Sequence, residues 1–539
     1  MEEPTASWAP WNFQLATMVP AAGWAPGLFP AETESADEMF GSGRHQTSVP
    51  SSSSGGHQQH YDPTIENNAV QELFDDVDFH SMSMEMKRIN QNNNPMRVFE
   101  VAAREFKVDI DTMKMKIHRY PTSIREFKQF EQWFTAPRLV AIGPYHHGRN
   151  HQLTHAEKAK HVAAYHCIME SGHPVQEVYD AVVSAAHEAR SLSLYAKDAM
   201  AVIGDGDFLP MMFYDACFLV QYMAWYMNTG GSGDDETAVM DPSLRGFFDF
   251  NRKAILHDIM LLENQIPWRV VAAVLLFRPV DLASFVAQWK DYLQDRKHLV
   301  LQEKKPFVLD DGYEPPHLLG LLRFYIVGRS SAKRPTKPKI MSSISESVSA
   351  IELAEIGIEL RANRAATEII HMGVTYRRGT AALFAELSLP PLSLDDERAS
   401  FLVNMAALEL CTTSNFQEAE DEESAICSYL LLLAMLVDRE EDVHELRKRR
   451  LLQGGGGLTN KEALEFLTGL QSLPLRGSSC YIRVMEEIEK YRINRPLQIM
   501  VHAFIYKHRT AIFTVFSVIG VLVSILGTLL SLKARSVIK

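Results

Sequence analysis

The chain has little cysteine. Its 539 residues include five, and no two of them form a C-x-x-C pair. Structural zinc sites and disulfide frameworks need clustered or paired cysteines, so the sequence excludes both. Reduced thiols fit a body that lies in the cytosol. The five are Cys167, Cys217, Cys411, Cys427 and Cys480.

Common nucleotide and hydrolase motifs are also missing. The sequence contains no G-x-x-x-x-G-K-[ST], no G-x-G-x-x-G after a predicted strand and no G-x-S-x-G. P-loop, dinucleotide-binding and α/β-hydrolase chemistry depend on these patterns. The glycine run 454–457 has no lysine placed to hold a phosphate. We therefore expect a protein with no cofactor and no enzymatic activity.

An excess of positive charge and a secretory signal are absent as well. The formal net charge is −13, whereas nucleic-acid-binding domains normally carry a basic surface. We expect no nucleic-acid partner. The N-terminus begins MEEPTASWAP and has no basic region followed by an apolar stretch, which argues against a signal peptide.

One apolar run stands out against this background. Residues 510–532 carry no charge over 23 residues, enough for a helix about 34 Å long, and a hydrocarbon core is about 30 Å thick. We predict a single transmembrane helix in the lipid bilayer. Lys507 and Arg509 precede the run, and Lys533 and Arg535 follow it. Further basic residues between 490 and 495 make the N-terminal flank the more basic, so we expect a cytosolic body, tail-anchored in the plasma membrane or an endomembrane.

Small residues recur inside this run. Gly520, Ser524 and Thr528 lie at four-residue spacing and so share one helix face, which would let two membrane helices pack closely. Small residues are also ordinary in membrane helices. A homo-oligomer formed through this face is one hypothesis. Binding of an unidentified protein partner is another.

Composition divides the chain into five parts. Residues 1–105 are rich in Pro, Ser, Gly, Gln and His, and we predict a disordered extension because they cannot bury enough apolar surface. Residues 106–328 and 350–506 are predicted to form two mainly helical lobes, the second with short strands. Residues 329–349 form a basic, proline-containing linker, and 510–532 form the span. The fold class is mainly α: a large helical body with a small β-hairpin, a disordered N-terminal arm and one C-terminal transmembrane helix.

Apolar periodicity places the individual elements. In residues 154–169, alanines and Cys167 form an apolar face opposite Glu157, Lys158 and Lys160. Core helices are predicted at 208–227, 254–276, 398–412 and 424–436, a short helix at 350–357, a long helical run at 481–506, and strands at 373–377 and 386–389.

Histidine is dense between residues 146 and 166. His151 and His155 have the i, i+4 spacing of two zinc ligands on one helix face. However, no H-E-x-x-H occurs, and Gly143, Pro144 and Gly148 place the first histidines in a turn. We therefore expect surface and capping histidines, and no metal.

Three acids lie inside apolar segments: Asp215, Asp258 and Glu263. Paired carboxylates can act as general acid and base, so the alternative function is a hydrolase that uses these acids with the His146–His147 pair. A buried acid is also tolerated when it meets an arginine or a helix N-terminus, and we favour this structural pairing. The available arginines are Arg138, Arg252 and Arg269.

Several ordered sequence blocks resemble one plant family. IHRYPTSIREF, APRLVAIGPYHHG, FYDACFLV and HDIMLLENQIP occur in that order, followed by PHLLGLLRFY, AIELAEIGIEL and LSLPPLSLDDERASFLVNMAALE. With VDREEDVHELRKRRLL and the terminal apolar run, they resemble the family known as domain of unknown function 247, from about residue 110 to the end.

The resemblance implies a plant membrane protein with no established catalytic activity, most simply an interaction or signalling protein. Some grass members of the family are implicated in pollen-side self-incompatibility, which would be recognition by a surface. Asn264 and Gln265, before Pro267, are predicted to satisfy backbone groups at a helix end. The family-motif residues, which we expect to be structural, are Gly143, Pro144, Tyr145, His146, His147, Asp215, Glu263, Asn264, Gln265 and Pro267.

Overall fold

The computed structural model describes residues 96, 99–100, 103–104, 106–107, 112–121, 134–148, 153–229, 240–294, 307–310, 312–329, 348–363, 368–376, 385–416, 419–453, 457–471 and 479–537. All of them belong to one unit, Asp62–Lys539. The predicted disordered extension, except for a few positions near its end, lies outside the described residues. So does the predicted linker, except for its two ends.

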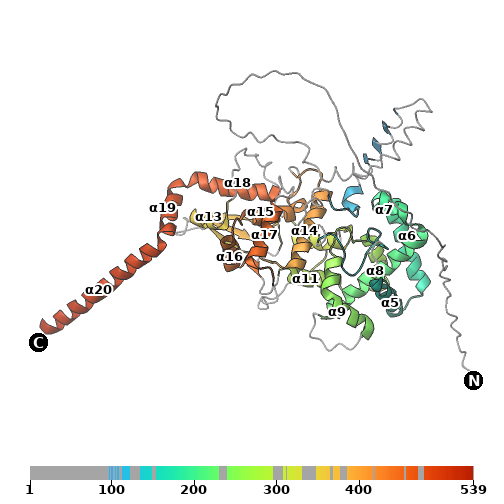
Figure 1. Cartoon of the computed structure of the whole chain (residues 1–539), viewed down its shortest axis with the longest axis horizontal. Helices are drawn as coiled ribbons and strands as arrows, with labels where there is room; N and C mark the ends of the chain where they lie inside the picture. Colours follow the sequence, from blue (N-terminus) through green and yellow to red (C-terminus); the bar gives the residue numbers. More distant parts are fainter. Residues whose placement is uncertain are drawn as a thin grey trace, which may run out of the picture. The chain divides into compact units, whose positions relative to one another are not determined.

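Helices dominate the described residues, as the sequence predicts (Figure 1). In the first half of the chain they are α5 (Thr154–Ser171), α6 (Val175–Ser191), α7 (Lys197–Val202), α8 (Asp205–Thr229), α9 (Pro242–Asp258), α10 (Trp268–Leu275), α11 (Leu282–Leu293) and α12 (Leu318–Val327), preceded by a short 3-10 turn, η2 (Met113–Met115).

The apolar helix α8 organises this half. It packs against α5, α6, α10 and α11, and its side chains are nearly all buried from Phe208 to Tyr226. The predicted apolar face of α5 is confirmed, since Ala156, Ala163 and Cys167 are buried. The prediction that Lys160 lies on the opposite, polar face is wrong: its exposed fraction is 0%.

The helix predicted at 254–276 is broken in the structure. α9 ends at Asp258 and α10 begins at Trp268, and the nine residues between them are non-helical yet buried. Pro267 accounts for the restart of the helix, because proline favours the first turn and disfavours helical backbone in the residue before it. The long helical run predicted at 481–506 is likewise divided, at Pro496.

The second half contains α13 (Ala350–Glu355), α14 (Asp396–Thr412), α15 (Ala425–Met435), α16 (Glu440–Lys448), α17 (Asn460–Leu470), α18 (Ser479–Asn494), α19 (Pro496–Lys507), α20 (Arg509–Val537) and the 3-10 turn η5 (Asp421–Glu423). Every residue of α15 is buried. It packs against α14, α17 and α18. Caps fix several helix starts; for example, the Asp395 carboxylate accepts the Arg398 amide at 2.8 Å at the start of α14.

A small sheet completes this half. The predicted hairpin is confirmed, because β2 (Gly373–Tyr376) pairs antiparallel with β3 (Ala385–Leu389). The sequence pattern did not predict β1 (Ile358–Ala362), which pairs parallel with β3 on its other side. Gly357, with φ of +88°, lets the chain turn from α13 into β1. A second, two-stranded sheet joins β4 (Leu392–Ser393) to β5 (Leu452–Gln453).

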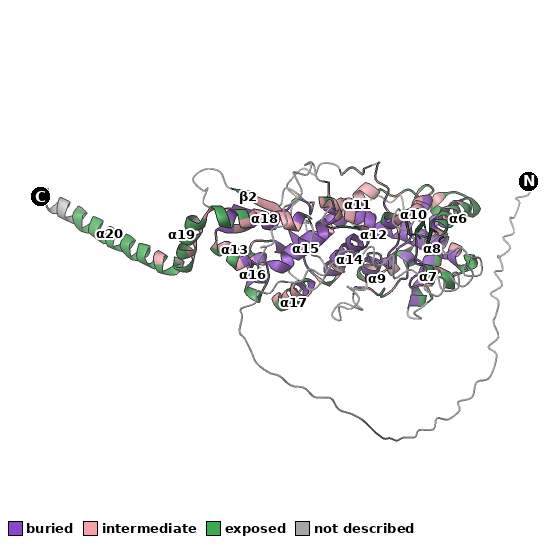
Figure 2. Cartoon of the chain, turned by 90° about the horizontal axis from the view of Figure 1, so that it is seen from above, coloured by how far each residue is buried: buried purple, intermediate pink, exposed green. Residues whose placement is uncertain are grey.

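One hydrophobic core runs through both predicted lobes, from Ile117 to Tyr491. Helices α9 and α12 of the first half contact α14 of the second half, and α11 contacts α12. In Figure 2 the buried residues gather in helices such as α8, α14 and α15, whereas the residues of α20 from Thr510 to Leu530 are exposed almost throughout. The boundaries proposed for the two lobes remain predictions.

Candidate functional site

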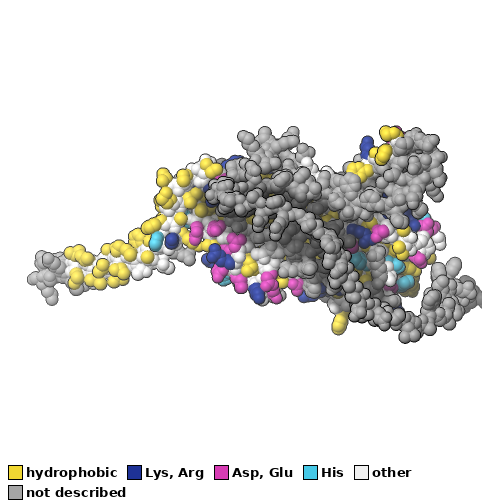
Figure 3. All heavy atoms as spheres, turned by 45° about the horizontal axis from the view of Figure 1, so that its top comes forward, with side chains coloured by type: hydrophobic (Ala, Val, Ile, Leu, Met, Phe, Trp, Pro, Cys, Tyr) yellow, Lys and Arg dark blue, Asp and Glu magenta, His cyan; other side chains and the backbone are white. Residues whose placement is uncertain are grey.

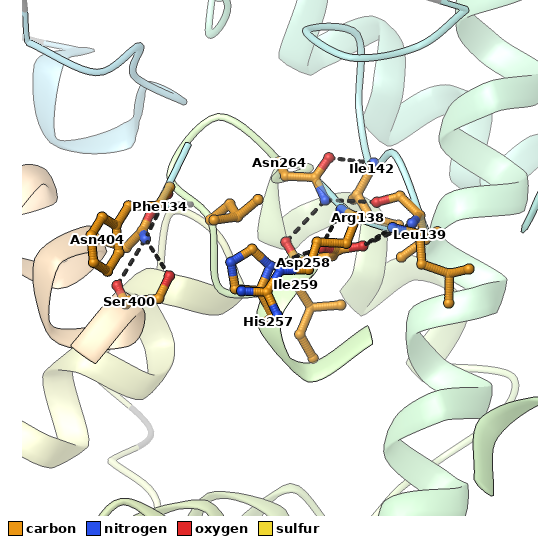
Figure 4. A network of polar contacts seen from close by, with 12 residues as sticks. Phe134, Arg138, Leu139, Ile142, His257, Asp258, Ile259, Asn264, Ser400 and Asn404 are labelled. Atoms are coloured by element: carbon orange, nitrogen blue, oxygen red, sulfur yellow. Dashed lines mark hydrogen bonds and ion pairs between the residues drawn. The ribbon is translucent and has the colours of Figure 1, made fainter. Parts of the chain in front are cut away.

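The segments 134–148 and 257–267, which contain the family strings APRLVAIGPYHHG and HDIMLLENQIP, meet in one buried polar network, shown in Figure 4. Neither segment forms a helix or strand over most of its length, and residues 140–145 are all buried. Buried backbone outside regular structure has no ladder of partners, so side chains must supply its hydrogen bonds.

Asp258, the last residue of α9, is the centre of this network. Its exposed fraction is 0%. Its carboxylate accepts the backbone amides of Arg138 at 2.8 Å, Leu139 at 2.7 Å and Val140 at 2.8 Å. The His257 Nδ1 lies 2.9 Å from the same carboxylate. One buried side chain therefore holds three consecutive peptide groups.

Asn264 and Gln265 hold neighbouring backbone groups, as the sequence predicts for amides beside Pro267. Asn264 Oδ1 accepts the Ile142 amide at 2.7 Å, and its Nδ2 donates to the Val140 and Asp258 carbonyls at 3.0 and 2.9 Å. Gln265 Nε2 donates to the Ile259 and Leu261 carbonyls at 2.7 and 2.8 Å. These bonds fix the shape of the non-helical segment between α9 and α10.

Asp215 and Lys160 form a buried ion pair between α8 and α5. The Lys160 Nζ lies 2.7 Å from Asp215 Oδ1, and the two side chains are each 1% exposed. Asp215 Oδ2 accepts the Gly143 amide at 2.8 Å, and Lys160 also donates to the Ala141 carbonyl at 2.5 Å. Burial raises the pKa of Asp215 despite the nearby ammonium group. The pair thus ties two helices to the 134–148 segment at a desolvation cost.

Glu263 is nearest to the surface of the three acids. It is 7% exposed, and its Oε1 accepts the Tyr120 amide at 2.7 Å. Its Oε2 lies 4.0 Å from His146 Nε2. His146 and His147 are half-buried, at the end of the same segment. This contact brings one of the three acids to the histidine pair.

Comparison with known proteins places the chain in a family. The DUF247 model, described as a plant protein of unknown function, matches residues 117–523. The chain belongs to this family. A curated relative, UPF0481 protein At3g47200 of Arabidopsis thaliana, is 23% identical over 342 residues, covering 61% of this chain and 67% of the relative. No solved structure matches.

The DUF247 match encloses the whole polar network and more than half of the apolar run at 510–532. The hydrolase hypothesis requires the acids and the histidine pair to meet in one solvent-reachable cleft. Asp258 and Asp215 are instead buried and accept backbone amides, whereas the Glu263 carboxylate lies 4.0 Å from His146. Among the described residues no group of His, Cys, Asp or Glu could hold a metal, and His151 lies outside the described residues.

The predicted arginine partner is wrong for Asp215, which meets Lys160 instead. Asp258 accepts the backbone amide of Arg138. Arg269 pairs with Glu314 at 2.9 Å, on the surface. Arg252 stacks over Trp225 and Tyr226. The sequence singled out the buried acids but not the groups that bind them.

Two further buried side chains of this DUF247 core were missed by the sequence analysis. Asn404 of α14 accepts the Leu262 amide at 2.6 Å and donates to the Phe134 carbonyl at 3.2 Å, so it joins the second half of the chain to the network. Glu409 accepts the Cys427 amide at 2.8 Å at the start of α15, and pairs with Arg323 at 2.7 Å. The available signal was a polar residue inside the apolar run FLVNMAALEL.

Replacing Gly143 by alanine should destabilise the DUF247 body much more than the same change at Gly148. Both glycines have positive φ, of 74° and 67°, which costs alanine about 1–2 kcal/mol. A Cβ at Gly143 would overlap the Gln265 carbonyl oxygen, whereas one at Gly148 meets nothing within 4 Å. Overpacking adds about 1–3 kcal/mol at Gly143. Urea unfolding of the full chain in detergent micelles compares G143A with G148A; equal losses would contradict the close contact.

His317 predicts a pH dependence of stability. Burial, and next the nearby His118, lower the pKa of His317 to about 3. An unfolded histidine titrates near 6.5, so the unfolded chain binds more protons between these values. The stability is present above about 6.5 and lost as pH falls, by up to about 1.4 kcal/mol per pH unit.

The matched variants for this prediction are H317N and H155N. Asparagine can still accept the Gly320 amide, which His317 Nδ1 accepts at 3.3 Å as the N-cap of α12. H317N should flatten the fall in unfolding free energy between neutral and mildly acidic pH. H155N, at an exposed position of α5, should leave that slope as in the wild type. An unchanged slope in H317N would assign the acid sensitivity to other groups.

The apolar C-terminal helix lies outside the core. Within α20, residues Thr510–Leu530 are long and apolar enough to cross a membrane, and none of the window is buried inside the body. Lys507 is exposed just before it, and Lys533 and Arg535 lie in its last turns. The Thr528 hydroxyl donates to the Ser524 carbonyl at 2.6 Å within the helix.

Proposed function

We propose that this DUF247 chain is a membrane-anchored interaction protein, in which α20 crosses a bilayer and the body, on the cytosolic side, binds a protein partner and does not catalyse a reaction. The observation that carries the proposal is the exposure of an uncharged 21-residue segment. Water solvates such an apolar surface poorly, whereas the hydrocarbon core of a bilayer accommodates it. The contacts of the motif acids support a structural role for them. The surface recognition implied by the family resemblance is consistent with a body that binds a protein partner.

The anchor is tested with two matched triple variants of the span. V518R/L522R/I525R places three charges in the middle of α20, each costing about 2.5–3.5 kcal/mol in a bilayer centre, and V518A/L522A/I525A keeps the helix uncharged. In plant-cell microsomes, the wild type and the alanine variant should resist alkaline carbonate extraction, and the arginine variant should be released. Retention of the arginine variant would contradict the anchor.

Sidedness and binding are tested in the same cells. Protease added outside sealed microsomes should digest the body and spare a tag placed after Lys539; protection of the body would reverse the orientation. Proximity labelling should recover a reproducible protein set that the arginine variant loses. If both forms label the same proteins, the membrane does not determine the partner.

A further inference from the structure

The helix α19, between the body and the span, is fixed against the body on one side. His502 Nδ1 lies 2.9 Å from the Glu355 carbonyl oxygen at the end of α13, and Ile499 packs against the hydrophobic core. A Cβ on Gly357 would lie 3.5 Å from the His502 ring. α19 is therefore part of the folded body and not a loose tether.

The opposite side of α19 is an exposed apolar stripe. Its five large side chains are between 50% and 74% exposed and follow the i, i+3, i+4, i+7, i+8 spacing of a single helix face. In Figure 3 the hydrophobic side chains of α20 continue onto α19. A soluble surface rarely presents a contiguous stripe of this kind without a partner. The stripe consists of Leu497, Met500, Val501, Phe504 and Ile505.

Chain continuity identifies what covers this stripe. Only His508, which is non-helical, separates α19 from Arg509 at the start of α20. Phe504 lies six residues before Thr510, about 9 Å along a helix, so a bilayer crossed by α20 lies within reach of the stripe. The break at His508 allows α19 to lie along the membrane surface while α20 enters it.

Charge favours the same occupant. After Glu489 the chain contains no acidic residue, but eight lysines and arginines, although the whole protein carries a net charge of −13. Lys507 is exposed at the end of α19, and Arg492 lies just before its start. Basic residues at both ends of an interfacial helix suit anionic headgroups.

We propose that α19 is an interfacial helix: its apolar stripe inserts at the boundary between headgroups and acyl chains of the bilayer that α20 crosses. The inference rests on the proposed membrane anchor and goes beyond it. Because α19 is bound to α13 through His502, insertion of the stripe holds the body against the membrane in one orientation. The surface offered to a protein partner is then set by this helix.

The test uses tryptophan quenching by brominated lipids. The full chain is reconstituted in phosphatidylcholine–phosphatidylserine vesicles whose phosphatidylcholine is brominated either near the headgroup or deep in the acyl chain. The wild type contains seven tryptophans, so each variant is read by the emission that it adds to that of the wild type. Three single variants are used: F504W on the stripe, F516W in the span and F250W on α9, where the residue is 95% exposed on the body. Each is a conservative aromatic change at an exposed position.

F504W should be quenched most by shallow bromine, at least about twofold more than F250W, and F516W most by deep bromine. If F516W is quenched and F504W emits as in water, the anchor stands and the interfacial helix is overturned. If F504W emits in the blue but is unquenched, a protein, such as a second copy of this chain, covers the stripe and the proposal is also overturned. If F516W is unquenched, the anchor itself fails.

Discussion

Replacing Lys160 by methionine should lower the free energy of unfolding by about 3–5 kcal/mol, because it leaves the Asp215 carboxylate in the interior without its counter-charge. Without Lys160, the Asp215 carboxylate can become neutral by taking up a proton. The loss should therefore be smaller at acidic pH, where protonation neutralises Asp215, than at neutral pH. Urea unfolding of the full chain in detergent micelles, at both pH values, measures both effects.

A second substitution separates the charge pair from simple loss of packing. D215N removes the remaining charge but keeps an oxygen that can accept the Gly143 amide, now 2.8 Å from Asp215. K160M/D215N should therefore be more stable than K160M alone, with a coupling energy of about 0.5–3 kcal/mol. K158M, at an exposed position of the same helix, is the matched control and should change stability by no more than about 0.5 kcal/mol. If K160M costs no more than K158M, the ion pair does not stabilise the fold.

Lys160 also shows why part of the site escaped the sequence analysis. It lies four residues after Ala156 and three before Ala163, so it shares the apolar face of α5. The spacing was available, but lysine is so seldom fully buried that residue type outweighed position. The partner, Asp215, is 55 residues away in the chain, and nothing local in the sequence pairs the two.

The elements that sequence did predict are those whose periodicity is set by burial. The helices α5, α8, α14 and α15 and the β2–β3 hairpin follow from apolar spacing within one segment. β1 was missed because its five residues follow directly on α13 and depend on pairing with β3, 27 residues later. The apolar pattern predicts helix through the buried stretch at 259–267, because a buried non-helical segment is as apolar as a core helix. Its actual shape depends on the amides of Asn264 and Gln265 within it and on Asn404 of α14.

Exposure of α19 could not be foreseen either. Its sequence contains apolar residues on two faces, and only the contact of His502 with the end of α13 shows which face is turned to the body. The span itself was visible from composition alone. Its helical form is confirmed, whereas its insertion and orientation remain proposals.

Replacing Asp258 by alanine should cost at least about 4 kcal/mol, because the amides of Arg138, Leu139 and Val140 would each lose their acceptor in the interior. A loss of this size approaches the total stability of many domains, so D258A is expected to yield little folded protein. D258N is the milder test, since one oxygen remains to accept and the amide group that replaces the other can only donate. Urea unfolding should show a loss of about 2–3 kcal/mol for D258N. D180N, at an exposed position of α6, should stay within about 0.5 kcal/mol of the wild type.

Hydrogen exchange locates the effect of D258N within the folded chain. If Asp258 holds the 134–148 segment, the amides of residues 138–140 should exchange faster in D258N while those of α15 remain protected, since local opening requires less free energy than global unfolding. The same loosening should reach His146 and His147, which the segment carries to the surface. Unchanged exchange at 138–140 would show that packing, and not the carboxylate, holds the segment. Faster exchange at 138–140 would show that the Asp258 carboxylate holds the segment in place, and with it the position of His146 and His147.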